Sequence, residues 1–266
     1  MDLKETILGL YKPIIGVVHL KPLPGSPRYR DCFEDILDRA LSDAVNLVEN
    51  GVDAIIIENY GDKPFAIRVR DPETIAAYSI IAWEIKKHID RPIGLSLLRN
   101  SGAEAMAIAC VVGADFIRVN ALAEPVWSPE GILLPIARDI WLKKSVLKCK
   151  TQIFGDVNVK HGKPILELDE AVKEAIDRGL ADAIVVTGSR TGLPPEPAIV
   201  KYVKKLSGKP VIVGSGITVD NIRVYWDIAD GFIIGTYFKK KHIIEEPVDP
   251  NNVKALIDII KKLRSK

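Results

Sequence analysis

An acidic residue followed by a run of apolar residues occurs four times along the chain, and this repeat restricts the fold more than any other feature. The copies begin at Asp53, Asp115, Asp182 and Asp230 and continue as AIIIEN, FIRVNA, AIVVTG and GFIIGT. Each follows a stretch with helical patterning, and glycine stands shortly before the first three, where a helix is expected to stop. Short apolar runs rich in β-branched residues predict buried strands.

A second set of apolar runs alternates with the first. Three of these begin after a basic residue and a proline, at Lys12, Arg91 and Lys209, and the fourth begins at Thr151. Amphipathic segments separate the runs, and helices are expected at residues 33–50, 72–89, 168–179 and 251–263. Eight strands alternating with helices match the (β/α)8 barrel, which typically takes about 250 residues. We therefore predict one α/β domain over residues 1–266, a TIM barrel of the ribulose-phosphate-binding type.

An open doubly wound sheet is the alternative fold, but no G-x-G-x-x-G motif opens the first predicted helix. The chain has 37 Lys and Arg against 35 Asp and Glu, so it carries no strong field for nucleic acid or a membrane surface. Its longest apolar runs, such as residues 54–57, are far below the roughly 20 residues that span a bilayer. The N-terminal segment lacks the features of a signal peptide. We expect a cytoplasmic protein with no nucleic-acid partner and no membrane insertion.

The three cysteines, Cys32, Cys110 and Cys149, are odd in number and widely separated. This spacing argues against a disulfide framework and against a zinc site. Glutamine occurs once and methionine twice, while lysine, isoleucine and glutamate are abundant. That composition is typical of a protein from a thermophilic organism.

Polar residues are concentrated where the predicted strands end, which is where TIM barrels carry their active sites. Five residues beyond each repeated aspartate stand Glu58, Asn120, Thr187 and Gly235. Arg118 shares a face with Asn120, because side chains two apart on a strand point to the same side. An arginine facing the helix layer would be costly, so we expect this face to lie inside the barrel near its mouth.

The fifth predicted strand is the most polar. Asp156, Asn158 and Lys160 alternate with valines, and His161 follows. If the valines pack against the helices, the three polar side chains point into the barrel. A buried lysine needs a carboxylate partner, and an Asp156–Lys160 pair would supply acid–base or Schiff-base chemistry. A solvated strand end with a purely structural ion pair is the alternative.

Two further strand ends carry features of a binding site. His19 ends the first strand and precedes a proline-rich loop with basic residues that would meet an anion, namely Lys21, Arg28 and Arg30. The seventh and eighth strands end in Gly214-Ser215-Gly216 and Gly235-Thr236. TIM barrels that bind phosphate hold it there with backbone N–H groups, which glycine lets approach closely. We expect a phosphate-type anion; the alternative is that these glycines only turn the chain.

A histidine-rich metal site is not expected, because the chain has four histidines and His88 lies on a predicted helix. A Mg²⁺ held by carboxylates near Glu58, Asp62 or Asp156 is left open as an alternative. A G-x-S-x-G nucleophile elbow does not occur in the sequence. We therefore predict no cofactor other than this optional Mg²⁺.

Seven strand-end segments carry a family resemblance, and they are GVVHLKPLPGSP from Gly16, ENYGDKPF from Glu58, DVNVKH from Asp156, TGSRTGLP from Thr187, GSGIT from Gly214, DGFIIGTYFK from Asp230 and PVDP from Pro247. As a set they resemble the BtpA/SgcQ family of barrel proteins. The resemblance implies a TIM barrel and links with photosystem I biogenesis in cyanobacteria and with sugar-related gene clusters in bacteria, but it brings no settled reaction. The chain departs from the family pattern at Lys239-KKHIIEE, where a glycine and an asparagine are expected.

Two functions follow from these observations. The first is an enzyme, with acid–base, lyase, isomerase or hydrolase chemistry, acting on a small phosphorylated metabolite such as a phosphosugar or nucleotide-like compound. Its predicted catalytic residues are Lys160, Asp156, Glu58 and His19. Its predicted substrate-binding residues are Asn59, Arg118, Asn120, Asn158, His161, Thr187, Gly214, Ser215, Gly216, Gly235 and Thr236.

The second function is a non-catalytic assembly or stability factor, as in photosystem I biogenesis, that uses the barrel as a scaffold or ligand sensor. Such a factor would carry its functional residues on an exposed apolar patch. Charges gathered in a barrel mouth favour the enzyme, because desolvation costs several kcal/mol per ion. Association into a homo-oligomer is common for this architecture and is expected as an option.

Overall fold

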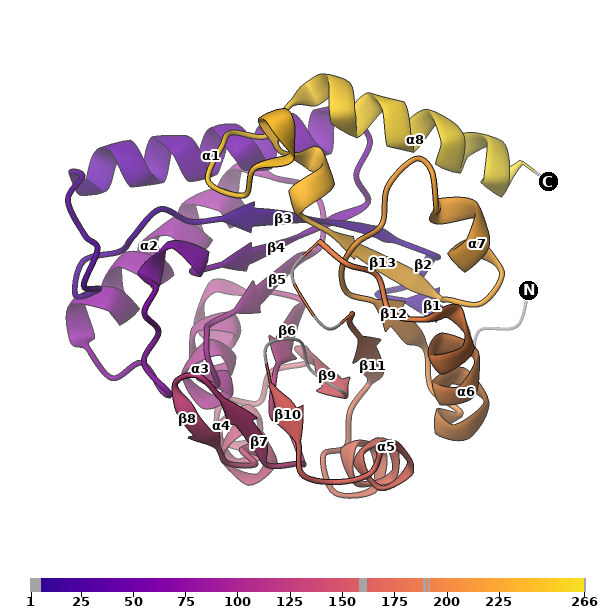
Figure 1. Cartoon of the computed structure of the whole chain (residues 1–266). Helices are drawn as coiled ribbons and strands as arrows, with labels where there is room; N and C mark the ends of the chain where they lie inside the picture. The colour runs from indigo at the N-terminus through magenta and orange to yellow at the C-terminus, as the bar shows by residue number, and fades with distance from the viewer. Residues whose placement is uncertain (1–5, 158–161, 189, 191, 266) are drawn as a thin grey trace.

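Eight parallel strands form a closed barrel in the computed structural model, which describes residues 6–157, 162–188, 190 and 192–265 (Figure 1). The strands are β3 (Ile14–His19), β4 (Ala54–Glu58), β5 (Ile93–Ser96), β6 (Phe116–Val119), β9 (Gln152–Val157), β11 (Ala183–Val186), β12 (Val211–Val213) and β13 (Gly231–Ile234). Pairing of β13 with β3 closes the barrel. These are the eight runs expected from the sequence, and the predicted TIM barrel is confirmed.

Helices surround the barrel and connect its strands (Figure 1). They are α1 (Phe33–Glu49), α2 (Pro72–His88), α3 (Gly102–Val112), α4 (Ala137–Leu147), α5 (Leu168–Asp177), α6 (Pro197–Ser207), α7 (Ile222–Trp226) and α8 (Pro250–Arg264). The four predicted helices correspond to α1, α2, α5 and α8. Proline opens α2, α6 and α8, a position where its missing N–H costs no hydrogen bond.

The repeated aspartates have a structural role at the N-terminal ends of the strands. Each carboxylate accepts an N–H from the start of the preceding barrel strand. These bonds join Asp53 to Ile14 at 2.8 Å, Asp115 to Ile93 at 2.8 Å, Asp182 to Ile153 at 2.8 Å, and Asp230 to Val211 at 2.9 Å. A buried N–H at a strand start needs an acceptor. Each repeated aspartate therefore links two neighbouring strands by the same hydrogen bond, which we call an aspartate clamp.

Apolar side chains fill the barrel at its N-terminal end. The interior cluster includes Phe116 and Phe154, whose rings stack with centroids 4.5 Å apart. Ile7 joins the same cluster from a hairpin of β1 (Thr6–Ile7) and β2 (Leu10–Tyr11). A larger apolar layer lies between the strands and the helices. Polar groups are therefore left to the opposite end, where the strands finish.

Short elements are added around that end. A three-stranded antiparallel sheet contains β7 (Val126–Ser128), β8 (Gly131–Leu133) and β10 (Lys163–Pro164). Three 3₁₀ turns are η2 (Tyr60–Asp62), η3 (Thr236–Phe238) and η4 (Lys240–His242). The sequence patterns do not predict these elements, because each is shorter than the window in which periodicity becomes visible.

The cysteines differ from expectation. Cys110 on α3 and Cys149 just after α4 form a disulfide, so the inference from their wide spacing was wrong. The two are 39 residues apart in sequence, but α3 and α4 pack against each other and bring them together. Cys32 is exposed and free. Within the described ranges, no helix combines the length and the apolarity needed to cross a membrane.

The loop that departs from the family pattern is fixed to the fold by a buried lysine. Lys239 is fully buried and its Nζ donates to Oδ2 of Asp43 on α1 at 2.7 Å. Burial lowers the pKa of Lys239, although the charge of Asp43 and their hydrogen bond act in the opposite direction. Asp43 also accepts the N–H of Val248 at 2.8 Å. The two ends of the loop that departs from the family pattern, at Lys239 and Val248, are thereby bonded to α1.

Candidate functional site

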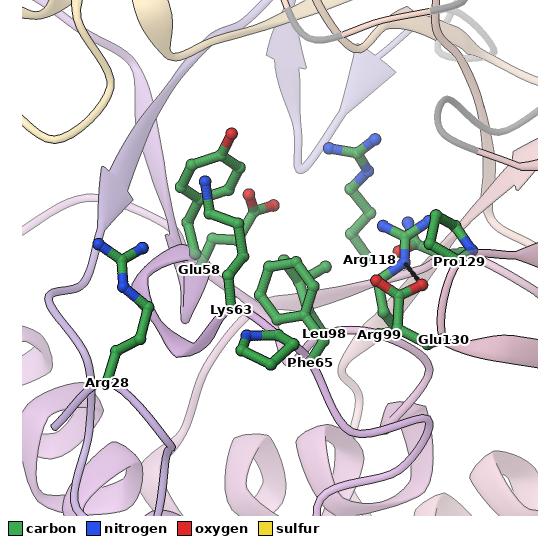
Figure 2. Close-up of a pocket in the computed structure, with 12 residues that line it drawn as sticks. Arg28, Glu58, Lys63, Phe65, Leu98, Arg99, Arg118, Pro129 and Glu130 are labelled. Atoms are coloured by element: carbon green, nitrogen blue, oxygen red, sulfur yellow. Dashed lines mark ion pairs between the residues drawn. The ribbon is translucent and has the colours of Figure 1, made fainter.

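A cavity of about 620 Å³ opens at the C-terminal ends of β4, β5 and β6. Its lining residues are Arg28, Glu58, Tyr60, Lys63, Pro64, Phe65, Leu98, Arg99, Arg118, Asn120, Pro129 and Glu130. Figure 2 shows Arg28 and Lys63 on one side, Arg99 and Glu130 on the other, and Phe65 and Leu98 between them. The larger part of the mouth is thus a mainly apolar cavity with a charged rim, which consists of Arg28, Lys63, Arg99 and Glu130.

A second cavity of about 300 Å³ lies over the ends of β12 and β13. A narrow space of about 30 Å³ lies between the two cavities and is lined by residues of both. It shares Glu58, Tyr60 and Arg118 with the larger cavity. It shares Gly216 and Gly235 with the smaller one. The three spaces form one elongated hollow, which we call the mouth hollow.

Glu58 and His19 stand side by side in the middle of this hollow. They are paired residues of neighbouring strands, with His19 Nε2 4.0 Å from Glu58 Oε1. Ser96 Oγ donates to the other carboxylate oxygen at 3.3 Å. The His19 ring rests on Gly235, where a Cβ atom would lie 2.6 Å from its Cε1. An acid and an imidazole therefore adjoin the glycine end of the hollow.

Arg118 is held by a buried carboxylate. Its Nε and Nη2 donate to the two oxygens of Asp156 at 2.8 and 2.9 Å, and Asn120 Nδ2 donates to the same carboxylate at 2.9 Å. Burial lowers the pKa of Arg118, but the charge of Asp156 and its hydrogen bonds outweigh burial, so the pKa is raised. Arg118 is a permanent positive charge in the narrow space.

The proposed lysine partner of Asp156 lies outside the described residues. Asn158, Lys160 and His161 fall in the segment 158–161, and the Asp156–Lys160 pair stays a prediction. The partners that the structure does describe for this carboxylate, Arg118 and Asn120, fill it with three hydrogen bonds. An aspartate held in this way positions its neighbours.

Of the backbone N–H groups predicted to bind an anion at the glycine end, one is already hydrogen-bonded within the protein. Gly214 was expected to offer its N–H, but this group donates to Val186 O at 2.8 Å within the sheet. Its missing side chain instead leaves room for Val185 and Thr187, whose Cγ1 and Cγ2 atoms lie 2.7 and 2.9 Å from the place of a Cβ. The N–H groups of Gly216 and Gly235 have no hydrogen-bond acceptor among the described residues.

The loop after β12 is fixed in a shape that only glycine tolerates. Gly216 has a φ of +73°, and a Cβ there would lie 2.0 Å from the backbone nitrogen of Pro194. Asn221 Nδ2 donates to Gly216 O at 2.8 Å, and its Oδ1 accepts the N–H of Thr218 at 2.9 Å. Ser215 Oγ donates to the backbone of the neighbouring loop at 2.9 Å. The glycine end is preformed.

Two other predicted residues do not line the mouth hollow. Asn59 is fully buried; its Nδ2 donates to Asp62 at 2.8 Å and its Oδ1 accepts the N–H of Leu98 at 2.7 Å. Thr187 is buried and packs beside Gly214. Both support the loops behind the hollow.

Of the carboxylates considered for Mg²⁺, Asp62 and Asp156 each accept hydrogen bonds from protein groups. In the part of the chain that the structure describes, no three His, Cys, Asp or Glu side chains gather as a metal site.

Residues that the sequence reasoning missed supply much of the larger cavity. Tyr60, Lys63 and Phe65 belong to the ENYGDKPF segment, in which the sequence analysis singled out Glu58, Asn59 and Asp62. Lys63 Nζ lies 3.8 Å from the Tyr60 ring centroid. Leu98 and Arg99 follow β5 in a segment without a recognisable motif. The position of ENYGDKPF directly after a barrel strand was the available signal.

The family of the chain follows from comparison with known sequences. The profile of the BtpA family matches residues 10–262. The chain belongs to the BtpA family. An uncharacterized protein of Methanocaldococcus jannaschii is 43% identical over 253 residues, which cover 95% of this chain and 97% of the relative. The photosystem I biogenesis protein BtpA of Synechocystis is 37% identical over 270 residues, covering 100% and 94%.

A solved structure shares the architecture of this BtpA-family chain. A thiamine phosphate pyrophosphorylase from Pyrococcus furiosus is 15% identical, with a TM-score of 0.56, and the match covers 95% of this chain and 96% of the other. The resemblance inferred from the strand-end segments is confirmed for the BtpA family. Residues 10–262 include the whole mouth hollow.

Proposed function

We propose that this BtpA-family barrel is an enzyme that binds a small phosphorylated metabolite in the mouth hollow. The proposal rests on one observation: backbone N–H groups of glycines and charged side chains line the same narrow space. Gly216 and Gly235, whose N–H groups have no acceptor among the described residues, line the same narrow space as His19, Glu58 and Arg118. Phosphate sites of TIM barrels lie at this pair of strand ends.

We assign phosphate binding, proton transfer and positioning to different residues of the hollow. The N–H groups of Gly216 and Gly235 bind phosphate oxygens, and Arg118 adds a charge that no physiological pH removes. Glu58 transfers a proton to or from the substrate, since it is 6% exposed and lies beside the imidazole of His19. Asp156 and Asn120 hold Arg118 in place. Lys160 stays a second candidate for acid–base or Schiff-base chemistry.

Phosphate binding is tested first, by ³¹P NMR titration of the chain with inorganic phosphate. We expect saturable binding, weakened at least about tenfold by Gly235→Ala, because the added methyl group would displace His19 from the glycine end. Lys254→Ala, at an exposed position of α8, is the control. Absence of saturable phosphate binding, or equal loss in both variants, would contradict the proposal.

Catalysis is tested by screening phosphorylated metabolites for turnover and then comparing variants. Glu58→Gln and Lys160→Met are each expected to abolish turnover while leaving the circular dichroism spectrum unchanged. Undiminished turnover in either variant would remove that residue from the mechanism.

A non-catalytic assembly factor is the second candidate, and the name of the Synechocystis relative favours it. Consecutive helices α2, α3 and α4 expose apolar side chains, among them Trp83, Val111 and Val146. These are the residues that a partner or a second copy of the chain would cover. The molar mass in solution, measured with wild type and Trp83→Ser, distinguishes a dimer of this face from a monomer.

A further inference from the structure

The larger cavity extends the mouth hollow well beyond the place of a phosphate, and its walls are mainly apolar. Glu58, Arg118 and Asn120 line its inner end and four charged residues its rim, and the remaining wall is formed by Tyr60, Pro64, Phe65, Leu98 and Pro129. Its volume of about 620 Å³ lies within the roughly 300–1,000 Å³ that small-molecule sites occupy. A bare sugar phosphate has no flat apolar face to lie against the rings and prolines of this wall.

We propose that the substrate carries a planar heteroaromatic group as well as its phosphate, as in a nucleotide, and that this group lies in the larger cavity against Phe65 and Leu98. The inference rests on the proposed function, because it places the phosphate at Gly216 and Gly235. It selects the nucleotide-like class over the phosphosugar class.

Aromatic rings lead from the glycine end to this cavity. The His19 and Tyr60 rings meet edge to face with centroids 5.3 Å apart, and Tyr60 and Phe65 do so at 6.4 Å. Such rings offer flat faces on which a base stacks. Figure 2 shows Phe65 beside Leu98 between the two charged sides of the cavity. The phosphate and the ring of one molecule would therefore be bound at opposite ends of the hollow.

Asn120 supplies an acceptor that calls for a ligand. Its side chain is 5% exposed and lines the larger cavity. Its Nδ2 donates to Asp156, which fixes the orientation of the amide. Its Oδ1 is buried and has no hydrogen-bond partner among the described residues. A buried acceptor left without a donor is costly, and the exocyclic amino group or ring N–H of a base would satisfy it.

The charged rim argues against a second phosphate in this cavity. Lys63 Nζ lies 3.6 Å from Glu245, and Arg99 Nε lies 3.5 Å from Glu130. These two cations are balanced by carboxylates that would repel another dianion, which leaves Arg28 as the third cation of the rim. A single phosphate at the glycine end, joined through a sugar to an uncharged ring, fits this distribution.

The experiment is isothermal titration of the full chain with inorganic phosphate, ribose 5-phosphate, the nucleosides and their 5′-monophosphates AMP, GMP, CMP and UMP. We expect at least one nucleotide to bind about tenfold or more tightly than ribose 5-phosphate, as stacking of one base provides. Phe65→Ala should remove that gain and leave ribose 5-phosphate affinity within about twofold. Phe65→Tyr, which keeps the ring, and Ile67→Ala, an exposed residue of the same loop, are the controls.

The outcomes separate the two proposals. If ribose 5-phosphate binds and no nucleotide binds more tightly, the heteroaromatic inference fails while the phosphate site stands. If a nucleotide binds more tightly but Phe65→Ala leaves its affinity unchanged, the base lies elsewhere and the inference also fails. If a nucleoside binds as tightly as its nucleotide and inorganic phosphate does not bind, the proposed phosphate function fails.

Discussion

Asp62 is a buried carboxylate that joins the loop after β3 to the loop after β4 at the mouth of the barrel. Its Oδ1 accepts the N–H of Leu23 and its Oδ2 accepts Nδ2–H of Asn59, both at 2.8 Å. Burial raises the pKa of Asp62 above its ordinary value of 3.8, and the hydrogen bonds, which lower it, do not compensate. The ionised form is therefore disfavoured in the folded chain.

This raised pKa predicts a pH dependence of stability. The folded chain binds the Asp62 proton more tightly than the unfolded chain does, so its contribution is fully present below pH 3.8 and is lost as pH rises through the raised pKa. Urea unfolding of wild type and Asp62→Asn across this range should show their difference in free energy of unfolding moving against wild type with rising pH. Asp258→Asn, on the exposed side of α8, should show no such trend. A difference that moves in favour of wild type would contradict the assignment.

For single residues at the mouth, the sequence predicts which face of a strand they lie on but not which residues their side chains contact. Strand alternation correctly places Arg118 and Asp156 inside the barrel, because period-two patterning is local. The sequence predicts Lys160 as a partner of Asp156, and that pair stays a prediction because Lys160 lies outside the described residues. Arg118 is a partner of Asp156 that the sequence did not indicate. Arg118 on β6 pairs in register with Phe154 on β9, so its long side chain reaches the carboxylate two residues farther along. That register depends on barrel closure, which no local pattern contains.

At the scale of elements, the aspartate clamps explain why the strands were recognisable. Asp230 illustrates the arrangement: its Oδ2 accepts the N–H of Val211 at 2.9 Å, and its Oδ1 pairs with Lys204 Nζ at 2.7 Å. The same chemistry recurs before β4, β6 and β11. Short elements without such a requirement, including β7, β8, β10 and the five-residue α7, leave no comparable trace in the sequence.

The clamp predicts a graded loss of stability. Asp230→Ala leaves the buried N–H of Val211 without its acceptor and should lower the free energy of unfolding by about 1–3 kcal/mol. Asp230→Asn keeps an oxygen at this position and should lose less. Asp227→Ala, an exposed aspartate at the end of α7, is the matched control. Chemical denaturation measures all three, and equal stability of Asp230→Ala and the control would disprove the clamp.

The disulfide between α3 and α4 makes a second prediction for the elements. Cys110 and Cys149 enclose a segment set by their 39-residue separation, for which chain entropy predicts a stabilisation of about 4 kcal/mol. Thiol titration of the unfolded chain should find one thiol, that of Cys32, before reduction and three after it. Cys149→Ser should lower the melting temperature, and Cys32→Ser should not. Three thiols before reduction would show that the pair is not joined.

For the whole molecule, closure makes distant parts of the chain depend on one another. The last barrel strand pairs with the first, and α8 packs back over the start of the barrel. Arg264 near the C-terminal end of the described chain donates to Asp53 and to the backbone of Lys12. The fourfold repeat allowed this closed architecture to be predicted, because none of the eight alternating apolar runs is distinguished as the edge strand of an open sheet. The contents of the mouth depend on loops and therefore required the structure.

Closure predicts that the barrel cannot fold without its last helix. Val253, Leu256, Ile257 and Ile260 of α8 are 0–3% exposed, and burial of each such side chain contributes roughly 1.5–3 kcal/mol. Their sum of about 6–12 kcal/mol is comparable to the 5–15 kcal/mol that stabilises a typical domain. A chain ending at Asp249 should therefore lack the near-ultraviolet circular dichroism of the full chain and be digested rapidly by protease. A chain ending at Arg264 should behave as the full chain does. A protease-resistant chain without α8 would show that the first 249 residues form a stable unit, and the helix would then be an accessory to the barrel.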